Sequence, residues 1–456
     1  MKRRNFFGSA IAAGISSAFS VSCENESTRQ TVGNNDQKLP KTLAGMSIGE
    51  LRDDYRHRLF DKFLPFWDKG GYDDEIGGVM VNLNEDGSIA DDEKYIWFQG
   101  RGLWVYSFLY NNFGKNPRHI ERADKMHDFI VKYMYAGDGR WYERLNRDGS
   151  VKEGVSDKTN GWAFIADGLQ EYHRATGNEA DLAIIEDTVQ AIADVYEDPE
   201  YDGAVNLGGL SDETSLKGLR ELAMSRRFVK IISPLLMQIE NPRLEKVVRE
   251  HVDHMMNHFY HPEYGIVNEY LMHDYTRIPG FEDYTFTGHV TEGMWIVMLE
   301  ALRTKDRALF DKATEILRTH IEIGWDYIYG GLGSHYYVFD GPGRTREKLY
   351  DLKEGWANFE LLIPLVIAIE YTGESWAKDW YDRIYPYIIE TYDTDWGVWK
   401  QSVNRFGGPV NRELAIRKRW HPKRKGNFHQ PRAMMYNLLS FDRMIRNKGA
   451  LTPFPT

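Results

Sequence analysis

The segment Gly77-Gly78-Val79-Met80-Val81-Asn82 sets the pattern of the chain, because short segments that join glycine to aromatic or β-branched residues recur after it. The later segments are Gly139–Arg144, Asp202–Leu207, Tyr264–Glu269, Gly330–Gly333 and Trp396–Lys400. Each of them predicts a small hairpin. They follow one another at intervals of roughly 60 to 66 residues, about the length of two helices and their connections.

The stretches between these segments have the spacing of amphipathic helices, with apolar residues at i, i+3, i+4 and i+7. Leu51–Phe60 and Leu103–Tyr110 are two examples. The sequence therefore predicts an all-α fold of six helix-pair modules, in one domain because no Pro- or Ser-rich linker interrupts residues 48–446. A sixfold repeat favours a closed toroid whose inner helices surround a pocket that the hairpins cover on one side. An open solenoid is the alternative.

The composition favours a sugar over a nucleic acid as the partner. The chain has 456 residues, a net charge of −11 and a pI near 5.8, so it does not attract phosphate backbones or anionic lipids over long range. Aromatic residues make up 14%, with 13 Trp and 27 Tyr. Such a content is common in carbohydrate-binding clefts, although aromatic packing in a large helical domain explains it equally well.

The N-terminus predicts export from the cytoplasm. Lys2, Arg3 and Arg4 precede a short apolar run that ends before Cys23, the only cysteine. We interpret residues 1–23 as a twin-arginine or lipoprotein-like export signal, with Cys23 as the lipidation site and plain cleavage without lipid as the alternative. Residues 24–43 predict a flexible tether, and 44–456 a single domain. We expect a periplasmic or membrane-anchored bacterial lipoprotein that contacts the membrane only through this anchor.

Two segments in the first two thirds of the chain carry candidate site residues. In Trp97–Trp104, Arg101 lies among aromatic residues, where its paired donors suit sugar oxygens; a simple Arg–carboxylate bridge is the alternative. In Gly288–Trp295, His289 and Glu292 share one helical face, so the carboxylate can orient the imidazole or bind substrate. A core histidine bonded to a nearby acid is the alternative. The sequence has no HExxH pattern or Cys/His cluster, which argues against zinc.

Two further segments follow towards the C-terminus. In Lys353–Glu360, Trp356 and Glu360 lie one helical turn apart and can line a sugar pocket, unless Glu360 only pairs with a neighbouring cation. In Lys425–Arg432, His429 lies between basic residues, which would lower its pKa and favour a neutral base. A basic run that includes Arg417–Arg419 precedes this segment and is either a solvated loop or an attractor for an anionic sugar.

In this order and at this spacing, the four segments resemble the N-acylglucosamine 2-epimerase family, which includes cellobiose 2-epimerases and related aldose–ketose isomerases. The likeness runs from about residue 50 to 445. It implies an (α/α)6 barrel in which Arg101 binds substrate, His289 and His429 exchange protons at carbon, and Glu292 and Glu360 hold or polarise the sugar. It adds Trp97, Trp356 and Arg432 to the substrate-binding set. It implies neither a metal nor another cofactor.

The implied reaction fits these residue types. A carbon beside an open-chain aldehyde loses its proton only if the resulting enediolate is stabilised, and a cationic Arg101 would favour that oxyanion. Two histidines on opposite sides of the planar intermediate can take the proton from one face and return it to the other. The expected function is therefore a cofactor-independent sugar 2-epimerase or isomerase that acts at C2 of a reducing sugar.

The sequence also departs from the family pattern. Where cellobiose-type members carry a further histidine, this chain has Met224–Phe228, which suggests an acidic sugar bound through Arg226 or Arg227. One alternative function is glycan breakdown, by an unsaturated glycuronyl hydrolase or polysaccharide lyase, for which Asp157 is the candidate acid. A non-catalytic sugar-binding lipoprotein is another. We expect a monomer or homodimer.

Overall fold

The computed structural model describes residues 38–155, 159–205, 214–338, 345–347, 352–411 and 423–456. Gln37–Thr456 form one compact unit. The predicted export signal of residues 1–23, its lipidation site Cys23 and most of the predicted tether lie outside the described residues. Asp157, the acid considered for a hydrolase, and the basic run Arg417–Arg419 also lie outside them.

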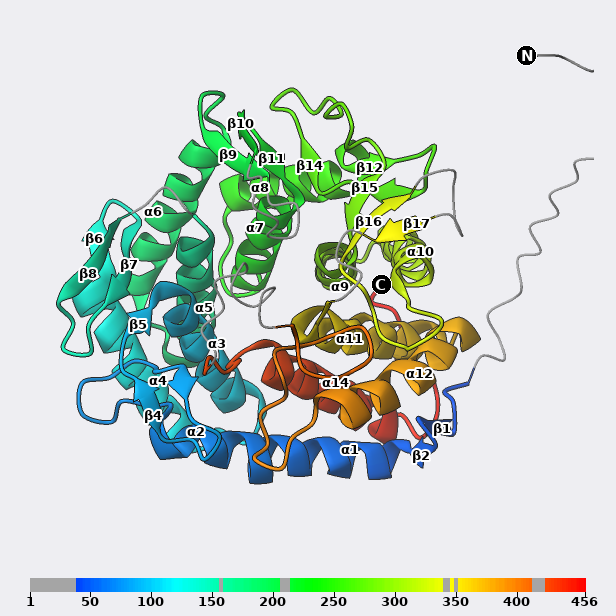
Figure 1. The fold of residues 1–456 in the computed structure, drawn as a ribbon, viewed down its shortest axis with the longest axis horizontal. Helices are drawn as coiled ribbons and strands as arrows, with labels where there is room; N and C mark the ends of the chain where they lie inside the picture. Colours follow the sequence, from blue (N-terminus) through cyan, green and yellow to red (C-terminus); the bar gives the residue numbers. More distant parts are fainter. Residues whose placement is uncertain (1–37, 156–158, 206–213, 339–344, 348–351, 412–422) are drawn as a thin grey trace, which may run out of the picture. The chain divides into compact units, whose positions relative to one another are not determined.

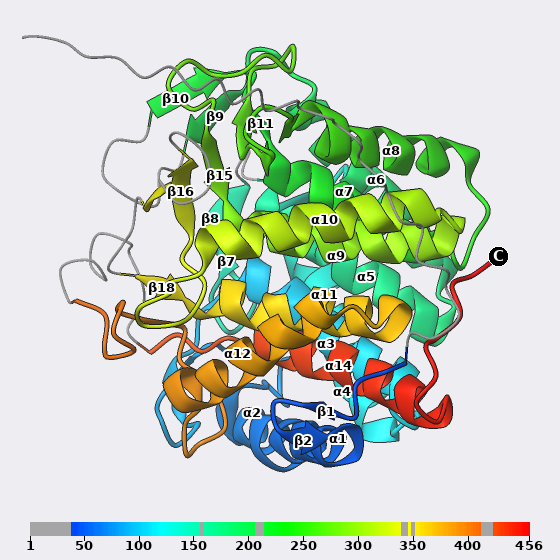
Figure 2. The same cartoon turned by 90° about the vertical axis from the view of Figure 1, so that its right-hand side faces the viewer.

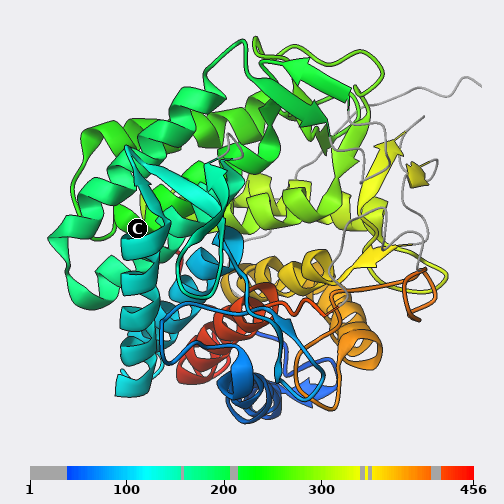
Figure 3. The ribbon, with the colours of Figure 1, turned by 60° about the vertical axis from the view of Figure 1, so that its left-hand side comes forward.

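Six inner helices form a closed ring. They are α3 (Ile96–Asn112), α5 (Asn160–Thr176), α7 (Leu222–Leu235), α9 (Thr287–Thr304), α11 (Gly355–Thr372) and α14 (His429–Arg446). Each inner helix packs against the next one along the chain, and α14 also packs against α3. Figures 1 and 3 show this closure, with the red last helix beside the blue first module. The predicted toroid is therefore confirmed as an (α/α)6 barrel, and the open solenoid is wrong.

An outer helix packs against each inner one. The outer helices are α1 (Ile48–Arg56), α4 (Pro117–Phe129), α6 (Glu179–Tyr196), α8 (Pro242–Asp253), α10 (Arg307–Gly324) and α12 (Ser375–Tyr392). Three of them continue into π-helical segments, which are η1 (His57–Phe63), η2 (Ile130–Met134) and η3 (His254–His258). The short helix α2 (Leu64–Gly70) follows η1. None of the helices in the described ranges combines the length and apolar character needed to cross a membrane.

The two layers differ in how their helices begin. Five outer helices start with a side chain that accepts a hydrogen bond from a backbone N–H of the first turn, and these caps are Ser47, Asn116, Asn178, Asn241 and Asp306. None of the six inner helices has such a cap. The first-turn N–H groups of the inner helices therefore keep the partial positive charge of the helix dipole without a capping oxygen.

Short antiparallel strands connect the helices, and many of them gather at one end of the ring (Figure 2). The strands are β1 (Thr42–Leu43), β2 (Met46–Ser47), β3 (Asn82–Leu83), β4 (Ile89–Asp91), β5 (Lys94–Tyr95), β6 (Tyr135–Gly137), β7 (Arg140–Leu145), β8 (Val151–Val155), β9 (Asp202–Val205), β10 (Thr214–Lys217), β11 (Arg220–Glu221), β12 (Tyr260–His261), β13 (Ile266–Val267), β14 (Tyr270–Leu271), β15 (Tyr284–Phe286), β16 (His335–Val338), β17 (Thr345–Glu347), β18 (Lys353–Glu354) and β19 (Ser402–Val403). β5 to β8 form one four-stranded sheet, β15 to β17 form a three-stranded sheet, and the other strands pair in twos.

The six recurring segments each connect an outer helix to the next inner helix. Gly139–Arg144 and Tyr264–Glu269 contribute strands to hairpins, as does the described part of Asp202–Leu207. Gly77–Asn82 and Gly330–Gly333 instead form tight turns, each closed by an isolated bridge across the turn. The described segment Trp396–Lys400 has no strand. The predicted spacing was therefore right, but only some of the segments are hairpins.

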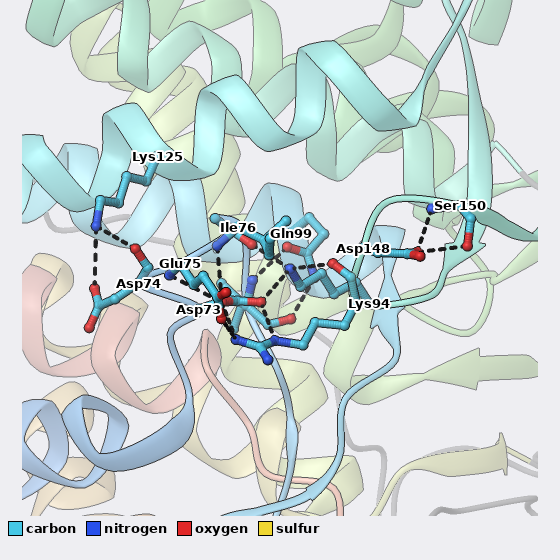
Figure 4. A network of polar contacts seen from close by, with 12 residues as sticks. Asp73, Asp74, Glu75, Ile76, Lys94, Gln99, Lys125, Asp148 and Ser150 are labelled. Carbon is cyan, nitrogen blue, oxygen red and sulfur yellow. Dashed lines mark hydrogen bonds and ion pairs between the residues drawn. The ribbon is translucent and has the colours of Figure 1, made fainter.

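A buried ion pair fixes the first of these turns (Figure 4). The ammonium of Lys94 lies 2.9 Å from a carboxylate oxygen of Asp73, and both side chains are fully buried. Arg147 donates to the same carboxylate through two bonds of 2.8 Å. Gln99, in the first turns of α3, pairs its amide with the backbone N–H and C=O of Val79, each at 2.7 Å. The start of α3 is thus held to the turn before it.

The fifth module repeats this arrangement with different residues. Lys353 lies 3.0 Å from Asp326, and Arg405 donates to the same carboxylate at 2.8 Å. Asn358 of α11 pairs its amide with the backbone of Leu332, at 2.7 Å and 3.1 Å. Two modules far apart in the chain therefore position their inner helices by the same buried contacts, and α11 carries two of the predicted site residues.

The compact unit begins earlier than the sequence predicted. Leu39 and Leu43 are buried in the core, and Lys38 forms a β-bridge with Ala450 near the C-terminus. Residues 38–43 therefore belong to the barrel and not to the predicted tether of 24–43. Their polar neighbours Lys38, Lys41 and Thr42 gave the segment a linker-like composition, while the two leucines fill space between the first and last modules.

Candidate active site

Most of the predicted site residues come together where the inner helices begin. Arg101 comes from α3, His289 and Glu292 from α9, Trp356 and Glu360 from α11, and His429 and Arg432 from α14. Residues that are more than three hundred positions apart in the sequence thus share one site, because equivalent turns of the ring's helices lie at the same level. A pocket beside them is lined mainly by side chains of α5 and α7 and by Glu292.

His289 is held by an acid that the sequence did not single out. Its Nδ1 atom lies 2.7 Å from Oε1 of Glu269, which follows β13 and is buried. Burial and the nearby Glu221 raise the pKa of the Glu269 carboxyl well above its ordinary value. Burial and the nearby Arg226 lower the pKa of His289 well below its ordinary value. The pair therefore favours a neutral carboxyl beside a neutral imidazole.

His429 is held differently. Its Nδ1 atom lies 2.8 Å from Oε1 of Glu360, which also accepts from Nε of Arg432 at 3.0 Å. Oε2 of Glu360 accepts from the indole N–H of Trp295 at 3.0 Å. Since both carboxylate oxygens act as acceptors, His429 donates through Nδ1 and keeps a lone pair on Nε2. The pKa of His429 falls to about 4 because the ring is buried, and Arg101 and Arg432 add to the shift against the opposing effect of Glu360.

Trp356 contacts both histidines. Its ring centroid lies 5.5 Å from that of His289 and 5.5 Å from that of His429. The indole is partly exposed, and it comes from the first turn of α11, one turn before Glu360. The shared face of α11 that the sequence predicted therefore places an aromatic ring beside both histidines and a buried carboxylate one turn further along the helix.

Glu292 does not orient His289 in this structure. Its carboxylate accepts from Nη2 of Arg432 at 2.6 Å and forms an ion pair with Arg226 of α7. Burial alone would raise the pKa of Glu292, but Arg226 and Arg432 hold it well below its ordinary value. Arg432 is itself fully buried and bridges Glu292 to Glu360. His289 and Glu292 do lie one turn apart on α9, but they do not bond each other: each side chain has a different partner.

Two cations lie at the ring of Phe164 in α5. The guanidinium carbon of Arg101 lies 4.1 Å from the ring centroid, and that of Arg227 lies 5.1 Å from it. Burial lowers the pKa of each to about 9, with further contributions from Arg432 for Arg101 and from Arg226 for Arg227. Trp97, 37% exposed at the start of α3, borders this group, because its ring lies 5.7 Å from the ring of Phe164 and 5.7 Å from the guanidinium carbon of Arg101.

Glu269 and Phe164 are site residues that sequence reasoning missed. Phe164 follows Gly161 and Trp162 at a helix start, in the same module position as the Trp97 segment, so its place in the repeat was a usable signal. Glu269 ends one of the six recurring segments, but nothing in the local pattern indicates which histidine it meets. Among the side chains that the structure describes, no group of three His, Cys, Asp or Glu is arranged to hold a metal ion.

Residues 77–422 match the sequence profile of the N-acylglucosamine 2-epimerase (GlcNAc 2-epimerase) family. Among curated proteins, the chain is 26% identical to the N-acylglucosamine 2-epimerase of Mus musculus over 388 residues, which covers 82% of this chain and 88% of the mouse protein. It is 20% identical to the cellobiose 2-epimerase of Eubacterium cellulosolvens over 388 residues, or 78% of this chain and 92% of that protein.

The fold is also shared with solved structures. The cellobiose 2-epimerase of Spirochaeta thermophila DSM 6192 superposes with a TM-score of 0.70 at 19% sequence identity, over 87% of this chain and 98% of that one. The two chains therefore share the same fold over nearly the whole length of the Spirochaeta thermophila protein.

Proposed function

The chain belongs to the N-acylglucosamine 2-epimerase family, and on that premise we propose that it is a sugar 2-epimerase or isomerase, with His289 and His429 moving a proton at C2 of a reducing sugar. The observation that supports this most directly is the pair of histidines on one tryptophan ring, each anchored through Nδ1 to a carboxyl group. With Nδ1 engaged, Nε2 is the atom that each ring offers to a substrate.

The different anchors support different roles for the two histidines. The Glu360 carboxylate leaves a lone pair on Nε2 of His429, so this residue takes the proton from C2. The electrons of the broken C–H bond move to the carbonyl, and the aldehyde oxygen at C1 becomes the oxyanion of an enediolate. A neutral Glu269 carboxyl donates to Nδ1 of His289, which places a proton on Nε2. His289 gives that proton to the other face of C2 while the Glu269 carboxyl passes its own proton to Nδ1, so His289 stays neutral and Glu269 becomes a carboxylate. The reverse reaction exchanges the two roles.

The surrounding charges serve this chemistry. Arg101 supplies a cation that stabilises the oxyanion. General acid–base catalysis by the two histidines contributes about 10²- to 10⁴-fold in rate. Arg432, Glu292 and Glu360 act as positioning residues that fix the His429 ring. Trp356 and Trp97 offer aromatic faces to the sugar.

Deuterium exchange tests this function. The protein is incubated in D₂O with reducing sugars, amino sugars and uronic acids, and proton NMR follows the signal at C2. We expect loss of that signal and formation of the C2 epimer or ketose. His289→Ala and His429→Ala should each abolish exchange while the circular dichroism stays unchanged. His57→Ala, an exposed histidine on the outer layer, is the matched control and should keep full activity. Exchange that survives both site substitutions would overturn the mechanism.

We also propose that the protein is exported and anchored through Cys23, and that it acts as a monomer or homodimer. The supporting features are the basic N-terminus, the short apolar run and the single cysteine. Labelling cells with a tritiated fatty acid should mark the protein, and Cys23→Ser should remove the label and release the protein into the periplasmic fraction. Unlabelled wild-type protein would refute the anchor. Light scattering after detergent extraction measures the oligomeric state.

A further inference from the structure

Among the described residues, two cations of the site, the partly buried Arg101 and the buried Arg227, lack the carboxylate partner that the others have. Arg226 and Arg432 pair with Glu292, and Lys230 pairs with Asp167. By contrast, no carboxylate of the described residues forms an ion pair with Arg101 or Arg227.

The two guanidinium groups share one aromatic neighbour, which lines the pocket. Both approach the ring of Phe164, and Arg227 lines the pocket while being only 8% exposed. Among the described residues, the Nε atom of each is buried and has no hydrogen-bond partner, and Nη1 of Arg227 donates only to the sulfur of Met224, at 3.5 Å. A buried charge without a partner is costly for folding, so its retention calls for a ligand that supplies the missing charge.

The nearest acids do not supply it. Glu292, Glu221 and Glu269 act on Arg227 electrostatically, Glu292 most strongly, but none of them forms an ion pair with it among the described contacts. Glu292 pairs with Arg226 and Arg432 instead. Glu269 bonds His289, and burial raises the pKa of the Glu221 and Glu269 carboxyls, which favours their neutral forms. The uncapped first turn of α7, just before Arg227, adds further positive potential.

The proposed reaction accounts for only one of the two free cations. The enediolate carries a single negative charge on the oxygen at C1, and Arg101 is the cation placed with His429 and Arg432 to meet it. A neutral sugar would leave Arg227 without an ion-pair partner among the described residues throughout the reaction. Building on the proposed epimerase or isomerase function, we infer that the substrate is an acidic reducing sugar whose oxyanion substituent binds Arg227.

The shared chemistry is an oxyanion that accepts paired N–H donors from a guanidinium. A uronic acid would supply it as a carboxylate, and a sugar ester would supply it as a phosphate or sulfate. A matched panel separates these sources: glucuronate, galacturonate and mannuronate, the corresponding 6-phosphates and 6-sulfates, and the neutral parent sugars. The measured quantity is kcat/KM for exchange at C2, with the wild-type protein.

We expect kcat/KM for one anionic class to exceed that for its neutral parent by about 10- to 100-fold, as a charge-assisted hydrogen bond supports. Arg227→Gln should remove this preference, because kcat/KM for the anionic sugar should fall by the same factor towards that for its neutral parent. Arg227→Lys keeps the charge but not the paired N–H donors of the guanidinium. Its preference for the anionic sugar should lie between that of the wild type and that of Arg227→Gln. The exposed Arg249→Gln on α8 is the matched control and should behave as wild type.

The outcomes separate this inference from the proposed function. Equal turnover of neutral and acidic sugars, with Arg227→Gln affecting both alike, would overturn the acidic substrate and keep the epimerase. If no sugar exchanges, calorimetric titration with the same uronates decides: binding that Arg227→Gln abolishes keeps the anion site and overturns the reaction. If the sugars show neither exchange nor binding, both the anion site and the proposed reaction are overturned. Thermal melts of each variant show whether it is folded.

Discussion

The rings of His289 and His429 lie at the same centroid distance, 5.5 Å, from the ring of Trp356. The two histidines come from α9 and α14, and the indole comes from α11, the inner helix between them in the ring. Trp356 thus fixes the separation of two groups that must reach opposite faces of one carbon. Its position makes it a specific target for mutation.

Trp356→Ala should lower kcat/KM by about 100-fold, because a displacement of about 1 Å in a reacting group costs that much. Trp356→Phe should keep most of the activity, since a smaller ring still separates the two imidazoles. Steady-state kinetics of exchange at C2 measures both. Trp376→Ala, on the outer helix α12, is the control and should leave kcat/KM unchanged. Equal losses in the Trp356→Phe and Trp356→Ala variants would indicate that the indole does more than separate the histidines.

The two carboxyl anchors should respond differently to the same substitution. Glu360→Gln replaces an acceptor oxygen with a donor and removes one of the two countercharges of Arg432, so kcat should fall by about 10²- to 10⁴-fold. Glu269→Gln keeps a neutral donor beside Nδ1 of His289 but has no acidic proton to pass to it, so kcat should fall by about tenfold, less than in Glu360→Gln, where a charge is also lost. Single-turnover exchange measures both variants. A larger loss for Glu269→Gln than for Glu360→Gln would reverse the roles assigned to the histidines.

The pH dependence of kcat/KM should show two limbs far from the ordinary histidine pKa. His429 works as a neutral base, and because its pKa is lowered to about 4, activity should be lost only as the pH falls through about 4. Arg101 and Arg227 work as cations, and because burial lowers the pKa of each to about 9, activity should decline as the pH rises through about 9. Circular dichroism at each pH separates titration from unfolding. An acid limb near 6.5 would show that the essential histidine is not the buried one.

The buried pair in the first module should matter for stability. Asp73→Asn leaves Lys94 as a buried cation without a carboxylate, and the free energy of unfolding should fall by about 3–5 kcal/mol. Adding Lys94→Met to this variant should restore part of the loss, since the uncompensated charge is then gone. Urea unfolding at pH 7 measures both. Asp53→Asn, at an exposed position, should change stability by less than about 0.5 kcal/mol. An additive loss in the double variant would argue against the ion-pair explanation.

The repeat, the helix pairs and the four segments at the starts of inner helices could be predicted from the sequence, because they depend on spacing along the chain. A period of two helices is visible in the recurring segments from Gly77 to Lys400, and His289, Trp356 and His429 each fall at a helix start that this period implies. The family likeness rests on the same local segments.

Only the tertiary structure decided which side chains meet. From the sequence, Glu292 was expected to contact His289. In the folded ring His289 instead hydrogen-bonds Glu269, and Glu292 forms ion pairs with Arg226 and Arg432. The physical reason is that a buried carboxylate takes the cation or donor nearest in space, and here those partners come from neighbouring helices and from a hairpin. For the same reason, the sequence could not show that no carboxylate of the described residues forms an ion pair with Arg227. This follows only from the positions of the surrounding helices and loops.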